Sequence, residues 1–272
     1  GDLARLGSRV TGYPGCEQAA VYLQEALYGL GVEEVYTYEF PVPIPLDEGF
    51  VLESGEERVA LYGVWPNLVR TVSLPVEGLE GGLVYGGRGL EDIEGVEIRG
   101  KVVVLEYGSG MYWVDVFHLG AAAVILVGAE GGHRKEAEQK FLDVPADLPR
   151  FYAAPEVEGR VGELAREGRV VRLRGSMSWR NAIGKVLVGV IPGRAAQLGQ
   201  EAVLLNAYYD AMSPVPALAP GAEQACSVAA LLEIVEALVR RPPRRTVLVV
   251  LTAGHFENLA GMRYFAPLLR RA

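Results

Sequence analysis

The chain has 272 residues, and half of them are hydrophobic, which is enough for a large core and favours two domains over one. Its net charge of −8, with no basic stripe to offset it, argues against a nucleic-acid partner. No apolar run approaches the roughly 20 residues that a membrane helix needs. The two cysteines, Cys16 and Cys226, lie too far apart in sequence to indicate a disulfide framework or a Cys-x-x-Cys metal site.

The first segment predicts a helix and a strand. LGSRVTGYPG (6–15) is rich in turn residues and leads into an apolar stripe of helical spacing over 16–30. A strand is predicted at 32–40. PVPIP (41–45) is expected to be a connector, because proline has no N–H to donate in a central strand.

From about residue 46 to residue 167 the predicted strands become short and are separated by glycines and acidic turns. The clearest are 81–89, 97–108 and 121–129, with helical spacing between the last two, over 109–120. A further strand and a short helix are predicted within 151–168. The region is expected to be a small α/β or β-barrel-like unit of its own.

Longer predicted strands return at 170–175 and 182–193. The middle unit therefore looks inserted into the first one. The predicted domains are residues 1–45 together with 168–272, and residues 46–167.

The stretch from 202 to 261 is the one around which the chain is organised. AVLLNAYY (202–209) and TVLVVLTA (246–253) are continuous apolar runs, and the residues between them, 222–241, have helical length and pattern. Two such runs around a helix indicate parallel strands that are buried on both faces. Ligands bind at the carboxyl ends of parallel strands, so the site is expected there. That edge carries Tyr208, Asp210, Glu223, Gln224, Cys226, His255 and Glu257.

These residue types allow three interpretations. Asp210, Glu223, His255 and Glu257 have side chains that suit a single zinc ion. Alternatively, Cys226, His255 and Asp210 form a nucleophile, a base and an orienting group, with the thiol activated near a helix N-terminus. The third interpretation is structural: Tyr208 packs, Glu223 favours the helix dipole, Glu257 caps a turn, and the thiol is a small hydrophobe.

Four segments, taken together and in order, resemble the secreted zinc aminopeptidase family that carries a protease-associated (PA) domain. Relatives of that family include glutamate carboxypeptidase, the transferrin receptor and nicastrin. The resemblance implies an α/β fold: a three-layer sandwich around a mostly parallel sheet, truncated here at its C-terminal side, with an inserted PA-like domain. The matching segments are SRVTGYPG (8–15), VEIRGKVVVLEYG with HLGAAAVILVG (96–108 and 118–128), NAIGKVLVGVIPG (181–193), and 203–265.

The resemblance also implies two zinc ions that share a bridging water, with a free glutamate as the base. The chain departs from that pattern at each position that can be tested. The family's His-x-Asp falls on Tyr208-Tyr209-Asp210 and its Asp-Asn pair on Gln224-Ala225. Its Glu-Glu pair falls on Gly254-His255, or on His255-Phe256 if the gap is placed earlier. Any further family ligands fall beyond residue 272. Neutral side chains leave two dications with too little compensating charge.

The first hypothesis is therefore a degenerate peptidase that binds or scaffolds a peptide or protein, with Tyr208, Gln224 and His255 lining the inherited cleft. It expects no cofactor and no confident catalytic residue. The alternatives are a zinc-dependent aminopeptidase with substituted ligands, and a cysteine or serine hydrolase at the same edge. The chain is expected to be part of a longer protein, and the family resemblance implies an extracytoplasmic or secreted location.

Overall fold

The computed structural model describes residues 1–129, 133–198 and 201–270. Contacts between Cα atoms divide the chain into two compact units. Unit 1 consists of Gly1–Ile44, Arg180–Ser213 and Leu218–Ala272, and unit 2 of Pro45–Trp179 and Pro214–Ala217. The chain passes from unit 2 back to unit 1 between residues 179 and 180, within the strand Val170–Ile191. No helix among the described residues has the length and apolar character to cross a bilayer.

Within the described residues, nine strands form a mixed sheet in the order β1-β2-β6-β5-β4-β3-β7-β9-β8, with a further pairing of β1 with β7. Four neighbouring pairs are antiparallel and four are parallel, so the expected mostly parallel sheet is corrected to a mixed one. The strands are β1 Glu34–Ser54, β2 Glu57–Gly63, β3 Leu79–Gly87, β4 Val102–Glu106, β5 Ala123–Val127, β6 Arg150–Tyr152, β7 Val170–Ile191, β8 Ala202–Tyr208 and β9 Thr246–Thr252.

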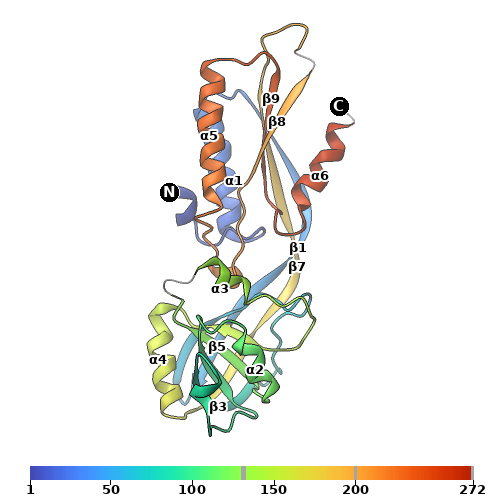
Figure 1. The fold of residues 1–272 in the computed structure, drawn as a ribbon. Coiled ribbons are helices and arrows are strands. Elements are labelled where there is room, and N and C mark those ends of the chain that lie inside the picture. Colours follow the sequence, from blue (N-terminus) through green and yellow to red (C-terminus); the bar gives the residue numbers. More distant parts are fainter. Residues whose placement is uncertain (130–132, 199–200, 271–272) are drawn as a thin grey trace. The chain divides into compact units, whose positions relative to one another are not determined.

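Unit 1 has helices on both faces of its strands. In Figure 1, α1 (Pro14–Gly29) and α5 (Ala225–Arg240) lie on one side of β8 and β9, and α6 (Ala260–Leu269) lies on the other. Ring contacts of Phe265 with Tyr38, and of Tyr264 with Phe40, hold α6 against β1. The predicted parallel pair is confirmed, because β8 and β9 run parallel from Ala202 opposite Thr246 to Tyr208 opposite Thr252.

The strand β1 continues through the segment that was predicted to be a connector, so that prediction was wrong. Pro41, Pro43 and Pro45 alternate with the buried Val42 and Ile44. Alternate residues of a strand direct their backbone groups to the same edge. The three missing N–H groups therefore share one edge, and the opposite edge remains able to pair with β7.

The strand β7 is likewise one element where two were predicted, because 176–181 contains no proline or glycine to interrupt it.

Unit 2 has an apolar core on each face of its central strands. Side chains of β4 and β5 alternate between two clusters: Val104 and Ile125 belong to one, and Leu105 and Leu126 to the other. Burial on both faces is the usual state of parallel strands. The helices of unit 2 are α2 (Tyr112–His118), α3 (Arg134–Glu138) and α4 (Pro155–Arg166).

Candidate functional site

The ends of β8 and β9 bring the predicted site residues to one edge of unit 1. Tyr208 and Thr252 are paired as the last residues of these strands, and the backbone N–H of Tyr209 donates to the carbonyl of Thr252 at 2.9 Å. Asp210 and His255 follow directly, one after each strand. Both strands are mostly apolar, with Asn206 as a polar side chain inside β8, and ionisable side chains appear only where the strands end.

Asp210 is fully buried at this edge. Its Oδ2 accepts hydrogen bonds from the Thr11 hydroxyl (3.0 Å) and from the backbone N–H of His255 (2.8 Å). Thr11 in turn accepts from the backbone N–H of Gly254 at 2.9 Å. Desolvation raises the pKa of Asp210 to about 6. The carboxylate thus ties the opening segment to the loop after β9, and it contacts the backbone of His255 rather than the imidazole ring.

Glu257 supplies a second covered carboxyl group. Neither of its oxygens has a hydrogen-bond partner among the described residues, and the same holds for Oδ1 of Asp210. Desolvation, followed by the charge of Asp210, raises the pKa of Glu257 to about 7. The negative charge of Asp210 thus adds to the cost of ionising Glu257.

An aromatic cluster of three partly exposed side chains occupies the ends of the strands. The rings of Tyr208 and His255 stack with centroids 3.7 Å apart and planes 14° from parallel. Phe256 meets both rings edge-on, at 5.7 Å from Tyr208 and 5.0 Å from His255. Burial lowers the pKa of His255, so its imidazole is neutral at pH 7. We call these three residues the aromatic cluster.

A buried arginine from the opening segment holds the loop between β8 and α5. Arg9 donates from its side chain to the carbonyls of Tyr209 (2.9 Å), Pro220 and Gly221 (2.8 Å). Sequence reasoning missed both Arg9 and Thr11 as parts of this edge. The only signal was that both belong to the SRVTGYPG segment, since nothing in a local pattern marks a polar side chain as buried.

The remaining candidates lie at the start of α5. Gln224 is partly buried, whereas Glu223 and Cys226 are exposed. The Sγ of Cys226 lies 3.7 Å from the carbonyl of Ala222, in the turn that precedes α5 (Ala225–Arg240). No group of three His, Cys, Asp or Glu residues in the described part of the chain is arranged to hold a metal ion. Asp210, Glu223, His255 and Glu257 therefore do not form such a group in this structure.

Comparisons with known proteins agree with this fold. Residues 187–270 match the profile of peptidase family M28. The chain is similar in structure to BSAP, a zinc aminopeptidase from Bacillus subtilis, with a TM-score of 0.59 and 17% identity over 91% of this chain and 57% of that one. It is also similar to a peptidase M28 precursor from Shewanella amazonensis, with a TM-score of 0.58 and 17% identity over 99% of this chain and 67% of that one.

No curated protein sequence matches the chain significantly. The chain spans 57% of the length of the Bacillus subtilis aminopeptidase. At such identities the structural likeness establishes an aminopeptidase-like α/β fold, and residues 187–270 carry the match to the peptidase family.

Proposed function

We propose that this chain is an aminopeptidase-like domain that has lost the dizinc site and binds a peptide or protein partner without cleaving it. The observation that carries the proposal is the aromatic cluster at the ends of β8 and β9. The two strand-end positions that would face a metal in a peptidase are filled by a phenol and an imidazole stacked on each other. The two rings pack face to face, and this packing requires no metal ion.

The donor set does not fit two zinc ions. Zinc in catalytic sites is held by histidine and carboxylate ligands. Position 208 offers a phenol, position 224 a neutral amide, and Asp210 already accepts two hydrogen bonds. We derive no reaction step through a metal.

In the proposed binding role, some side chains at this edge fix the loops and others contact the partner. Arg9, Thr11 and Asp210 fix the loops after β8 and β9 by buried hydrogen bonds. The aromatic cluster and Gln224 remain partly exposed beside them. Aromatic faces with a polar neighbour are typical of surfaces that recognise polypeptide. We propose that they contact the partner directly.

The wider context of the proposal rests on the family resemblance. We propose that unit 2 corresponds to a PA-like inserted domain, that the chain is part of a longer protein, and that it acts outside the cytoplasm. Unit 2 supports the first point with its parallel strands β3 to β6, which are covered by helices of its own.

The decisive experiment measures zinc per chain by elemental mass spectrometry after incubation with zinc and dialysis. We expect no retained zinc and no turnover of aminoacyl substrates. The variant Tyr208→His/Gln224→Asp restores a histidine and a carboxylate at the two neutral positions and is expected to retain more zinc than the wild type. Tyr208→Phe is the matched control, because it keeps the stack and adds no donor.

Two results would overturn the proposal in different ways. Steady aminoacyl hydrolysis that a chelator abolishes would establish the zinc peptidase with substituted ligands, and His255→Ala should then lose bound metal. Hydrolysis that resists the chelator but stops on alkylation of Cys226 would establish the thiol hydrolase.

A further inference from the structure

Unit 2 carries two exposed aliphatic side chains at the tip of a tight turn. Asn67 and Arg70 exchange backbone hydrogen bonds of 2.9 Å in both directions, so only Leu68 and Val69 form the turn between them. Asparagine followed by glycine is the sequence that such two-residue turns prefer. Here both residues are aliphatic, and Leu68 is 50% and Val69 64% exposed. We call these two side chains the aliphatic tip.

The turn holds this tip in a strained and fixed conformation. Leu68 has a φ of +51°, in the left-handed region that leucine rarely adopts. Its backbone N–H donates to the carbonyl of Leu142 at 2.9 Å, and the indole N–H of Trp179 donates to the carbonyl of Val69 at 2.7 Å. Backbone strain of this kind is found mostly at functional positions. A fixed tip also loses little conformational freedom when a partner binds it.

Unit 2 also has an apolar pocket, which shares no residue with this turn. The pocket has a volume of about 310 Å³ and lies between the 3-10 helix η2 (Leu90–Ile93), the segment 96–98 and the end of α2. Five of the six residues that line it are aliphatic. Ile93 and Ile98 are buried, whereas the other lining residues are exposed at its rim. The lining residues are Leu90, Ile93, Val96, Glu97, Ile98 and Leu119.

The charges around the pocket and around the aliphatic tip are complementary. Residues 90–99 contain four carboxylates and one arginine, all of them exposed, so the rim of the pocket is net negative. Arg88, just before this segment, is paired with Glu106. Arg70 directly follows the tip and is about half exposed, with its guanidinium 2.6 Å from Asp147. The tip therefore presents aliphatic groups beside an arginine, and the pocket presents an apolar interior below a net acidic rim.

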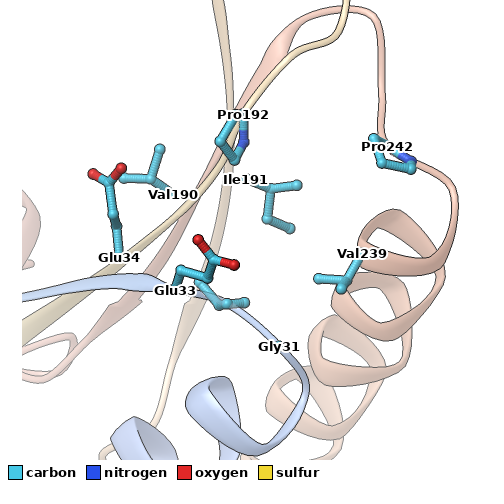
Figure 2. Close-up of a pocket in the computed structure, with 9 residues that line it drawn as sticks. Gly31, Glu33, Glu34, Val190, Ile191, Pro192, Val239 and Pro242 are labelled. Atoms are coloured by element: carbon cyan, nitrogen blue, oxygen red, sulfur yellow. The ribbon is translucent and has the colours of Figure 1, made fainter.

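A second hollow, in unit 1, suits an aliphatic side chain less well. Figure 2 shows Glu33 and Glu34 among the residues that line it, together with Val239. Its volume is about 290 Å³, so an aliphatic group that filled it would displace water from two carboxylates. The pocket of unit 2 has only Glu97 in its lining, and this residue is exposed at the rim. The pocket of unit 2 is therefore the better match for the tip.

We propose that the aliphatic tip of one chain inserts into the unit 2 pocket of a second copy of this chain. Leu68 and Val69 then pack against the buried Ile93 and Ile98, and Arg70 faces the carboxylates of the rim. A contact made by so few side chains belongs to the weak and transient class of protein interfaces. The proposal is independent of the function proposed for the ends of β8 and β9.

The test is sedimentation velocity of the full chain over a concentration series that reaches the millimolar range. We expect the sedimentation coefficient of the wild type to rise with concentration. The variant Leu68→Asn/Val69→Gly removes the tip and installs the sequence that the turn prefers, so it should weaken association by more than about tenfold without lowering the melting temperature. Leu90→Asp places a charge at the mouth of the pocket and should weaken association similarly.

Mixing the two variants tests the pairing of tip and pocket directly. The tip variant keeps its pocket and the Leu90→Asp variant keeps its tip, so an equimolar mixture should associate although neither variant does so alone. The matched control is Val76→Asp, which adds the same charge at a position of unit 2 that is 98% exposed, and it should associate as the wild type does. A wild type that stays monomeric, a mixture that stays monomeric, or an equal loss in Val76→Asp would each overturn the proposal.

Discussion

Unit 1 and unit 2 both bury charged side chains, but the buried acids of unit 1 differ from the buried bases of unit 2 in how completely they are hydrogen-bonded. In unit 2 the buried Lys140 bonds to Glu136 (2.6 Å) and to the carbonyl of Gly110 (2.8 Å), and the buried Arg150 bonds to three oxygen acceptors and stacks on Trp113. In unit 1, Asp210 and Glu257 are covered, yet three of their four carboxyl oxygens have no partner in the described residues. Complete partnering indicates a structural role, whereas incomplete partnering is typical of a site.

The largest expected effect tests the structural half of this comparison. Arg150→Met leaves the carbonyls of Lys140 and Trp65 and the side chain of Asn67 without their donor. We expect the free energy of unfolding to fall by about 3–5 kcal/mol, because three buried neutral acceptors lose their donor at about 1–3 kcal/mol each. Denaturant titration followed by tryptophan fluorescence measures it.

The control for that experiment is Arg58→Met, which removes an exposed ion pair with Glu53. It should cost less than about 1 kcal/mol. A similar, small loss in both variants would mean that Arg150 is not a structural clamp.

The second prediction concerns the incompletely partnered acids of unit 1. The pKa of Glu257 is raised from 4.5 to about 7, so between those values the folded chain holds a proton that the unfolded chain has lost. Wild-type stability should therefore fall as the pH rises through this window. Glu257→Gln removes this loss, and its free energy of unfolding relative to wild type should rise by about 2–3 kcal/mol from about pH 4 to about pH 8.

Melting curves at several pH values measure this difference. Glu77→Gln, at an exposed position, should show a constant offset from wild type. A pH-independent offset for Glu257→Gln as well would argue that its carboxyl group is solvated.

A smaller effect is expected for the aromatic cluster. Tyr208→Ala removes the stack on His255 and the edge contact with Phe256. Aromatic pairs contribute about 0.5–1.5 kcal/mol beyond their buried area, so the variant should lose about 1–2 kcal/mol while Tyr208→Phe loses little. If alanine and phenylalanine behave alike in thermal unfolding, the stack does not support this edge.

The smallest effect concerns the two thiols of unit 1. Cys16 is buried, and desolvation raises the pKa of its thiol, whereas Cys226 is exposed. A thiol reagent should modify one cysteine in the folded chain and the second only after denaturation. Modification should leave the melting temperature nearly unchanged. Rapid reaction of both thiols in the folded chain would show that α1 opens readily.

The elements that the sequence predicts well are those with one uninterrupted pattern. The apolar runs at 202–209 and 246–253 and the helical stretch at 222–241 agree with β8, β9 and α5 to within a few residues. The failures occur where local rules conflict with tertiary pairing. The prolines at 41–45 predict that no strand forms there. The strand β1 nevertheless continues through this segment, because its pairing with β7 uses the edge of β1 that keeps its N–H groups.

The sequence predicts that the site lies at the carboxyl ends of β8 and β9, but it does not predict the hydrogen bonds that organise the site. Parallel strands place Tyr208, Asp210 and His255 together by topology alone. The bonds that organise this edge join Thr11 to Asp210 and Arg9 to the loop before α5, about two hundred residues apart in sequence. No local pattern carries contacts of that range. The stacking of Tyr208 on His255 likewise depends on side-chain packing after the strands have paired.

The alternating prolines of β1 affect where a further strand can pair with the sheet of unit 1. Pro41 and Pro43 remove two successive donors from one edge of β1, so a strand that paired along that edge would have its hydrogen bonds interrupted there. At the other end of the order, β8 pairs in the described part of the chain only with β9, and it carries neither proline nor charge over Ala202–Tyr208. The free edge of β8 therefore offers an uninterrupted row of backbone donors and acceptors to a further strand.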